Sequence, residues 1–477
     1  YGFWYQNYST TYTPNETLTA VGDPQWRIRF TPIEEGVHNV TWMVHDKEGM
    51  HQYPQQQFNV LPTPANTGTT TGGFAAPSPT NPNRFVLDSR ASNSAKGQAT
   101  TQPYYLVGEN VCSYEQKANV TLMMQQWLSG LSAAGGNYAR VWALDNENTT
   151  AGLLALEKWI VGRYDLEAAF KLDGVLTMAE QLDIRIMLTL NDQHSFRESR
   201  RWNVSPYNAV NGGPLQHPAE LLTNTNATNF IERRLRYMAA RYGYSTAILA
   251  WELWNEVDFI DGYNSADAAS WHESMAWFLK SADFNGKHMV TTSMALEKGD
   301  PSVQGLEELD YVTTHHYDNI TYGGDMAAAV WTLEADKRKL FPHLPHYMGE
   351  FGLGLSPAEP DLQIIAMHNG LWASVAANSA GVASSWFWQT LVDEHDLYPE
   401  FSAVRAFVDS VDTNGQVTEW DQLLVQHSDN ASVRVMATVG TGPDADVPSA
   451  STSAEAVLWL QIRNHTWRSF NASRYQS

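Results

Sequence analysis

Apolar and polar residues alternate along this chain in a way that predicts eight buried strands separated by helices. The strands are short, nearly continuous apolar runs, as expected for parallel strands covered on both faces. We expect them at 105–108, 138–142, 184–190, 248–254, 289–293, 311–315, 347–350 and 382–388. Helical spacing of apolar residues recurs at about 166–182, 218–242, 265–283, 325–340, 361–378 and 399–410. This alternation predicts the α/β class and a (β/α)8 TIM barrel.

The residues on either side of the predicted barrel follow a different pattern. Residues 1–62 contain strand-like stretches separated by turn signals, which predicts a small N-terminal β-sandwich with few strands. Residues 63–103 are rich in Thr, Gly, Pro, Asn and Ser, so we expect a linker or an extended wrap along the barrel. The barrel would then occupy 104–412, and a small C-terminal β-domain 413–477.

Two predicted strands lead into a glutamate. Glu256 ends the apolar run 251–256, and Glu350 lies in the run 347–352. The two are 94 residues apart, about three repeats of a barrel with about 30 residues per unit, which assigns them to strands four and seven. Catalytic groups of such barrels lie at the C-terminal ends of the strands. Two carboxylates that face one another there suit the cleavage of a glycosidic bond, one as acid and one as nucleophile.

Composition narrows the class of partner. The chain has 30 basic and 52 acidic residues and a net charge of −22, which argues against nucleic acid or an anionic membrane surface. Its 18 tryptophans, 21 tyrosines and 17 phenylalanines exceed what a core usually needs, and flat rings suit the C–H faces of sugars, although most of them are expected in the core. We therefore expect a carbohydrate partner. No run of 18 apolar residues is present, so we expect no membrane span.

Glycosylation sequons are more frequent than chance placement predicts. Eleven Asn-x-Ser/Thr sequons begin at Asn7, Asn15, Asn39, Asn119, Asn148, Asn203, Asn226, Asn319, Asn430, Asn464 and Asn471. Together they indicate a glycoprotein that is secreted or held at the surface of a eukaryotic cell. Cys112, the single cysteine, is expected to be a buried thiol. Because the chain begins with Tyr1 and shows no signal peptide, we expect a processed or truncated start.

Four short motifs carry a resemblance to a known family. They are Trp-Asn-Glu at 254–256, His-x-Tyr at 315–317, Gly-Glu-Phe-Gly at 349–352 and the arginine at 140. Together they resemble the clan A retaining glycoside hydrolases, in particular the family 5 cellulases and mannanases. The stretch from about 104 to 410 looks like that barrel throughout. Residues 24–32 also look like the immunoglobulin-like β-sandwich that precedes the barrel in one branch of these enzymes.

The resemblance implies a role for each matching residue. Glu256 would be the acid/base and Glu350 the nucleophile. Asn255 would bind the sugar 2-hydroxyl, and Tyr317 would hydrogen-bond the nucleophile. Arg140, His315 and Trp388 are the remaining implied substrate contacts. Arg140 would also lower the pKa of the nucleophile, and Trp388 would form the floor of a sugar subsite. From their places at the ends of strands two and three, Trp142, Asn191 and His194, together with Asp192, would shape further subsites.

Several of these residues also have a structural interpretation. Arg140 could pair with Asp145 or Glu147, Asn255 could cap a loop, and His315 or Tyr317 could be satisfied core groups. Alternation along the strand predicts that His316 points away from the site. Trp386 shares the parity of Trp388, which we prefer because it is nearer the C-terminal end of the strand.

The end of strand three departs from the family's pattern. Its sequence at 190–194 has no unambiguous counterpart of the histidine that is frequent there, which leaves the substrate open. No cluster has the spacing of metal ligands, and neither a phosphate-binding glycine loop nor a Gly-x-Ser-x-Gly motif occurs, so we expect no metal and no cofactor.

The sequence thus predicts a retaining glycoside hydrolase that cleaves β-linked polysaccharide by double displacement, as an endo-acting glucanase or mannanase relative. The alternative is a glycosylated surface, wall or appendage protein that reuses a glycosidase barrel for binding or assembly. Self-assembly through the edges of incomplete β-domains would suit that alternative.

Overall fold

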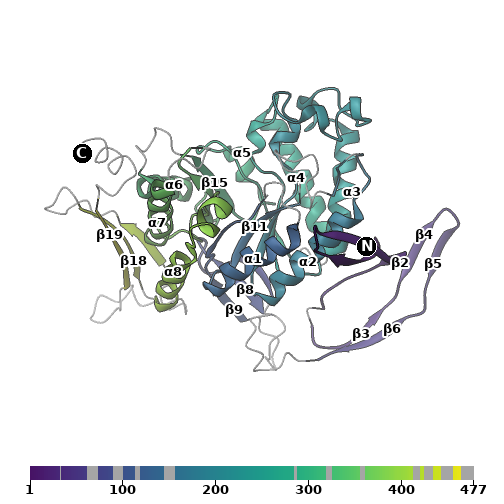
Figure 1. Cartoon of the computed structure of the whole chain (residues 1–477), viewed down its shortest axis with the longest axis horizontal. Helices are drawn as coiled ribbons and strands as arrows, with labels where there is room; N and C mark the ends of the chain where they lie inside the picture. Colours follow the sequence, from purple (N-terminus) through teal and green to yellow (C-terminus); the bar gives the residue numbers. More distant parts are fainter. Residues whose placement is uncertain are drawn as a thin grey trace.

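The computed structural model of this chain describes most of its length. The described residues are 1–32, 34–61, 73–89, 100–112, 119–143, 156–158, 160–283, 287–317, 325–354, 360–411, 419–423, 433–441 and 455–462. Within them, parallel strands occupy the centre, and most of the helices surround them (Figure 1). The predicted alternation of strands and helices is therefore present.

Seven regular parallel strands form the centre. One sheet has the order β10 to β14, with β10 at Gly108–Asn110, β11 at Tyr138–Trp142, β12 at Arg185–Thr189, β13 at Ile248–Glu252 and β14 at Met289–Thr291. A second sheet pairs β15, Val312–Tyr317, with β16, His346–Gly352. The residues of β11, β12 and β13 are all buried, which explains their continuous apolar sequence.

The eighth predicted strand is irregular, which corrects the prediction for 382–388. Only single parallel bridges occur there, from Gly381 to Leu106 and from Ser385 to Phe351. These bridges join the segment to β16 on one side and to the chain before β10 on the other, so it still closes the barrel. A π-helical turn begins at Trp388 and runs to Asp393 in place of the end of the strand.

Most of the helices agree with the predicted spacing, and polar side chains cap the start of several of them. The main helices are α1 (Val120–Ala133), α2 (Leu166–Gln181), α3 (Thr225–Tyr242), α4 (Ser265–Ala282), α6 (Met326–Leu340), α7 (Pro360–Ala376) and α8 (Tyr398–Ser410), with the short α5 at Pro301–Gln304. Asp165, Asn224 and Asn264 cap α2, α3 and α4 through their side-chain oxygens. Asn224 explains why α3 starts later than the predicted 218.

The described part of the first 104 residues forms strands in four separate sheets. A hairpin of β1 (Phe3–Thr11) and β2 (Thr17–Arg27) packs on α2 and α3. The pairs β3–β6 (Gly36–Val40 with Gln56–Val60) and β4–β5 (Met43–Asp46 with Gly49–Gln52) form an exposed ribbon that extends from the body (Figure 1).

The segment expected to be a linker contains a three-stranded antiparallel sheet. Its strands are β7 (Phe74–Pro77), β8 (Phe85–Ser89) and β9 (Thr100–Tyr104). Phe85 and Leu87 share a buried cluster with Tyr138, Tyr311 and other residues from the N-terminal halves of the barrel strands. The sheet therefore closes the end of the barrel opposite to the one at which catalytic groups are expected.

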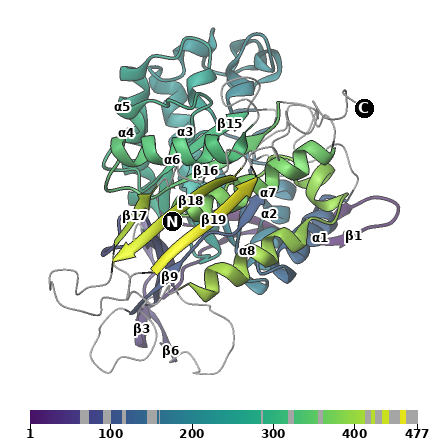
Figure 2. The same cartoon turned by 90° about the vertical axis from the view of Figure 1, so that its left-hand side faces the viewer.

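A second antiparallel sheet lies beside the last helices. It consists of β17 (Glu419–Leu423), β18 (Val433–Thr441) and β19 (Glu455–Ile462), and it contacts α7 (Figure 2). Met436 of β18 is buried in the main core. Cys112 is buried as predicted. Within the described residues, every helix is too short or too polar to cross a membrane.

Candidate active site

Glu256 and Glu350 lie at the C-terminal ends of β13 and β16. A bridge between Asp192 and Asn255 continues the pairing of β12 with β13 up to the residue before Glu256. Glu256 has a φ of 55°, in the left-handed region that such residues rarely adopt. Its amide donates a hydrogen bond of 3.2 Å to Ser293 Oγ. The loop is thus held in an uncommon conformation that directs the Glu256 side chain.

The two carboxylates face one another across His315. One oxygen of each carboxylate and one ring nitrogen of His315 all lie within 4.8 Å of one another. His315 Nδ1 is 3.0 Å from Glu256 Oε1 and 3.4 Å from Glu350 Oε2. In retaining glycosidases the carboxyl groups are about 5–5.5 Å apart, whereas inverting enzymes need about 6.5–9.5 Å. The spacing here suits a retaining pair.

Glu256 is placed to carry a proton near neutral pH. Burial, together with the nearby carboxylate of Asp192, raises its pKa to about 7. His194 and Arg140 oppose this shift, and Gln193 Nε2 donates to Glu256 Oε2 at 3.3 Å. These surroundings suit a general acid.

Glu350 has a different environment. Arg140 Nη1 donates to its Oε1, and the Tyr317 hydroxyl donates to its Oε2 at 2.7 Å. Burial raises the pKa of Glu350, while His315, Arg140 and Tyr317 act to lower it. The expected lowering by Arg140 is therefore present but is outweighed by burial. The direct cation and hydroxyl contacts favour the ionised form of Glu350 over that of Glu256.

Arg140 is completely buried, and each of its five N–H groups has an acceptor. Nε and Nη2 bind the carboxylate of Glu252 at 2.7 and 2.9 Å. Nη2 also donates to Asn255 Oδ1 at 2.8 Å, while Nη1 donates to Asn110 Oδ1 at 3.2 Å and to Glu350. The guanidinium therefore fixes Asn255 and Glu350 together, and the Asn255 amide nitrogen is left to donate. The alternative partners Asp145 and Glu147 lie outside the described residues.

The two adjacent histidines of β15 point in opposite directions. Burial lowers the pKa of His315, so its ring is neutral between the two carboxylates. Its Nε2 is buried without a partner among the described residues. His316 instead contacts Glu297 Oε1 at 2.6 Å, on the other face of the strand, as alternation predicts. The sequence therefore distinguished these two side chains correctly.

The residues at the end of β12 divide into two kinds. The Asn191 amide is used inside the protein, because it donates to Leu253 O at 2.7 Å and accepts from Arg234. This arrangement does not support the predicted substrate contact of Asn191. Asp192 lies between His194 Nδ1, at 3.0 Å, and Asn255 Nδ2, at 3.3 Å. His194 is thus connected to Asn255 through one carboxylate.

Three of the predicted barrel's tryptophans lie in contact. Trp142 and Trp386 have ring centroids 5.5 Å apart, and Trp386 and Trp388 are 5.4 Å apart. Trp388 is 6% exposed and packs edge-on against Trp127 of α1, whereas Trp386 is only partly buried. Strand parity could not separate Trp386 from Trp388 because the two residues are two positions apart and so share one parity. The geometry therefore favours Trp386 over Trp388 as the ring that lines the cleft.

Two residues of this site, Glu252 and Gln193, were not predicted from the sequence. Glu252, fully buried in β13, is the carboxylate that holds Arg140, and Gln193 contacts Glu256. A signal for Glu252 was available, since a charged residue in the middle of a buried strand requires a partner of opposite charge. The prediction that no metal binds here stays a prediction.

The barrel of this chain matches a known protein family. The family described as Cellulase (glycosyl hydrolase family 5) matches residues 100–391. This chain belongs to glycosyl hydrolase family 5. The match covers more than half of the chain and includes both glutamates, so the resemblance seen in the sequence is confirmed at the level of the family.

Characterised relatives of the chain are distant. It is 24% identical over 294 residues to mannan endo-1,4-beta-mannosidase A of Hypocrea jecorina, a match over 55% of this chain and 61% of that protein. It is 25% identical over 401 residues to mannan endo-1,4-beta-mannosidase 1 of Oryza sativa subsp. japonica, over 73% of this chain and 85% of that protein.

Solved structures share the fold. The endo-1,4-beta-mannanase of Rhizomucor miehei is similar with a TM-score of 0.50 at 16% identity, over 66% of this chain and 90% of that chain. A structure from Bacteroides vulgatus ATCC 8482 is similar with a TM-score of 0.53 at 12% identity, over 97% of this chain and 92% of that chain. Family membership and these likenesses establish the TIM barrel.

Proposed function

We propose that this family 5 chain is a retaining, endo-acting glycoside hydrolase of β-linked polysaccharide, with Glu256 as acid/base and Glu350 as nucleophile. The observation that carries the proposal is the spacing within 4.8 Å of two carboxylates, one partly buried and one buried, with different surroundings. One has a pKa of about 7. The other is bound by a guanidinium and a hydroxyl.

In the first step, a Glu350 oxygen attacks the anomeric carbon while Glu256 gives its proton to the leaving glycosidic oxygen. The bond between the anomeric carbon and that oxygen breaks, and a glycosyl ester on Glu350 forms. In the second step, Glu256, now ionised, takes a proton from water, whose oxygen attacks the same carbon and releases Glu350. Two inversions give net retention.

The neighbouring side chains have supporting roles. Arg140 holds Glu350 and Asn255, so the Asn255 amide nitrogen can donate to the sugar 2-hydroxyl as positive charge develops on the ring. The Tyr317 hydroxyl stabilises Glu350 as it departs in the second step. His315 presents its free Nε2 as a further sugar contact, and Trp386, in contact with Trp142, supplies an aromatic face for the sugar.

A β-1,4-linked mannan is the substrate that the relatives support, because the named proteins above are mannan endo-1,4-beta-mannosidases. The test is release of reducing sugar from mannan, β-1,4-glucan and β-1,3-glucan, with Glu350→Ala as the control. Activity on mannan that is lost in the variant is expected. A folded protein that is inactive on every polymer would overturn the proposal.

We also propose that the chain is a secreted glycoprotein. Of the sequon asparagines within the described residues, Asn7, Asn15, Asn39, Asn203 and Asn226 are exposed, whereas Asn119 is partly buried at the start of α1. The sequons at Asn148, Asn319, Asn430, Asn464 and Asn471 lie outside those residues. A fall in mass after endoglycosidase treatment of protein from a eukaryotic host tests this proposal. Self-assembly through strand edges stays a prediction.

A further inference from the structure

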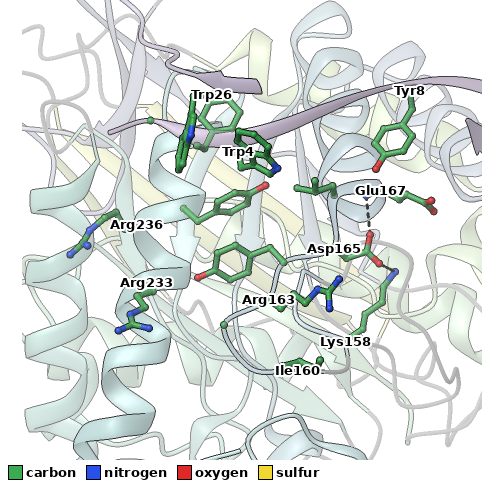
Figure 3. Close-up of a pocket in the computed structure, with 16 residues that line it drawn as sticks. Trp4, Tyr8, Trp26, Lys158, Ile160, Arg163, Asp165, Glu167, Arg233 and Arg236 are labelled. Carbon is green, nitrogen blue, oxygen red and sulfur yellow. Dashed lines mark hydrogen bonds and ion pairs between the residues drawn. The ribbon is translucent and has the colours of Figure 1, made fainter. Parts of the chain in front are cut away.

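A large groove lies on the side of the barrel, away from the two glutamates. It has a volume of about 1120 Å³, above the usual range of about 300–1,000 Å³ for small-molecule pockets. The N-terminal hairpin β1–β2 forms one wall, the turn before α2 a second, and α3 a third (Figure 3). The groove is thus large enough for several sugar units.

Aromatic rings line the wall made by the hairpin. Trp4 and Trp26 are cross-strand partners with ring centroids 5.5 Å apart, and they are 40% and 71% exposed. Tyr164, of the turn, and Tyr237, of α3, also line the groove, with centroids 4.5 Å apart. Exposed indole faces beside a hollow are typical of a binding surface, because rings of this size are otherwise buried.

Several of the charged groups around the groove contact other side chains of the protein. Lys158 Nζ binds Asp165 Oδ2 at 2.7 Å. The guanidinium of Arg233 lies over the ring of Phe230, and that of Arg236 over Tyr1 and Phe278. In Figure 3 the guanidinium groups of Arg233 and Arg236 point away from Trp4. Aromatic faces, with one ion pair and two ring-stacked guanidinium groups at the margin, suit a ligand that has apolar faces and hydroxyl edges.

The groove shares a wall with the catalytic end of the barrel. A small cavity of about 50 Å³ is lined by Asp192, Glu157 and Arg234, while the neighbouring residues Lys158 and Arg233 line the groove. Arg234 Nη1 binds Glu157 Oε2 at 3.1 Å and completes this wall. The wall made by Glu157 and Arg234 therefore separates the groove from the part of the catalytic cleft where Asp192 contacts Asn255.

We propose that this groove is a second carbohydrate-binding site, which holds a distant stretch of the β-linked polysaccharide whose cleavage is proposed above. Trp4 and Trp26 stack on the sugar rings, and the Lys158–Asp165 pair hydrogen-bonds the hydroxyl groups of the sugars. The inference rests on the proposed function for the identity of the ligand. It predicts that the groove contributes to the binding of long chains and not to cleavage itself.

The experiment compares wild type with a Trp4→Ala/Trp26→Ala double variant on soluble galactomannan, a long chain, and on mannohexaose, a short one. The double variant is expected to raise KM for galactomannan about tenfold, the effect of losing two stacking platforms, and to leave kcat/KM for mannohexaose unchanged. Mobility in gels that contain galactomannan reports binding without catalysis. Trp277→Ala is the matched control, since Trp277 is 65% exposed on α4, away from the groove.

Each outcome bears on one proposal. Unchanged KM and gel retardation in a folded double variant, with wild type active on mannohexaose, would overturn the groove as a glycan site. Gel retardation that depends on Trp4 and Trp26 supports the groove as a glycan site even if no substrate is cleaved. Inactivity of wild type on mannohexaose counts against the proposed function instead.

A Trp26→Phe variant that keeps galactomannan binding would show that the ring face, not the fold of the hairpin, is responsible. Capture of a protein by the groove, with no retardation by glycan, would assign it to a protein partner.

Discussion

Arg140 and Glu252 form a two-pronged ion pair inside the barrel, with Nε–Oε2 and Nη2–Oε1 distances of 2.7 and 2.9 Å. Both side chains are fully buried. Thr189 Oγ1 also donates to Glu252, so the carboxylate is fixed from a third direction. Glu252 contacts neither Glu256 nor Glu350 within hydrogen-bond distance in the described structure, yet it orients the guanidinium that binds Glu350 and Asn255. It is a positioning residue.

Replacement of Glu252 is expected to reduce both stability and activity. Glu252→Gln keeps the shape but removes one of the two carboxylates that bind the buried guanidinium, at a cost of about 3 kcal/mol in the free energy of unfolding. A displaced Arg140 is expected to lower kcat/KM by about 10²-fold. Urea unfolding and kinetics on the folded fraction measure the two effects.

The matched control is Glu334→Gln. Glu334 is also buried. It accepts a hydrogen bond from Ser379 Oγ at 2.6 Å and lies 3.0 Å from His346 Nδ1, away from the proposed catalytic pair. It is expected to lose stability and to keep kcat/KM. If both variants kept kcat/KM, Glu252 would have only a structural role.

The pH profile of the enzyme is expected to report the proton of Glu256. The acid must be protonated for the first step, so kcat/KM falls as the pH rises through its pKa of about 7. After burial, the Asp192 carboxylate is the main cause that raises this pKa. Asp192→Asn removes that negative charge, and the basic limb is expected to move to lower pH.

The comparison for this profile is Asp409→Asn, a change on the exposed face of α8. Because Asp192 also binds His194 and Asn255, kcat/KM at the optimum is expected to fall as well, but the position of the limb is independent of that loss. A limb that stays in place in Asp192→Asn would show that another group controls it.

Local pattern was enough to predict much of the fold. Continuous apolar runs located β11 to β13 and β15 to β16 because these strands are buried on both sides. The spacing of Glu256 and Glu350 then indicated the catalytic end of the barrel. Alternation in β15 separated His315 from His316 for the same reason. These features depend on residues that are close together in the sequence, so a local sequence pattern is enough to predict them.

Features that depend on distant residues could not be predicted in this way. Arg140 and Glu252 are 112 residues apart, and nothing local to either identifies the other. The sheet of β7 to β9 escaped notice because its sequence is rich in turn-forming residues, and its burial is provided by the barrel end. The preference for Trp388 assumed a regular strand, which the π-helical turn interrupts.

Trp386 and Trp388 are expected to respond differently to truncation. Trp386→Ala removes a partly buried ring beside Trp142, so KM for mannan is expected to rise about fivefold, with little change in stability. Trp388→Ala leaves a cavity against Trp127, with an expected loss of about 3–5 kcal/mol in the free energy of unfolding. Thermal unfolding and steady-state kinetics separate these effects. The reverse pattern would assign the sugar platform to Trp388.

Glu256 is also expected to destabilise the folded chain at neutral pH and above. Its pKa is about 7 in the folded state and 4.5 for a free glutamate side chain, so the folded chain binds this proton more tightly. Stability therefore falls as the pH rises from 4.5 to 7, and the cost reaches about 3 kcal/mol above pH 7. Glu256→Gln removes an ionisable group but keeps its shape. It is expected to match wild type in unfolding free energy at about pH 4 and to exceed it by up to about 3 kcal/mol at about pH 8.

Urea unfolding at the two pH values measures this difference, and Glu273→Gln on the exposed face of α4 controls for the loss of a surface carboxylate. The same Glu256→Gln protein should be almost inactive on mannan, because neither the acid step nor the base step can proceed. A gain in stability at the higher pH with a loss of activity would show that the burial that tunes Glu256 for proton transfer also lowers the stability of the fold. An equal stability difference at both pH values would show instead that Glu256 is ionised at both and that its proton does not set the profile.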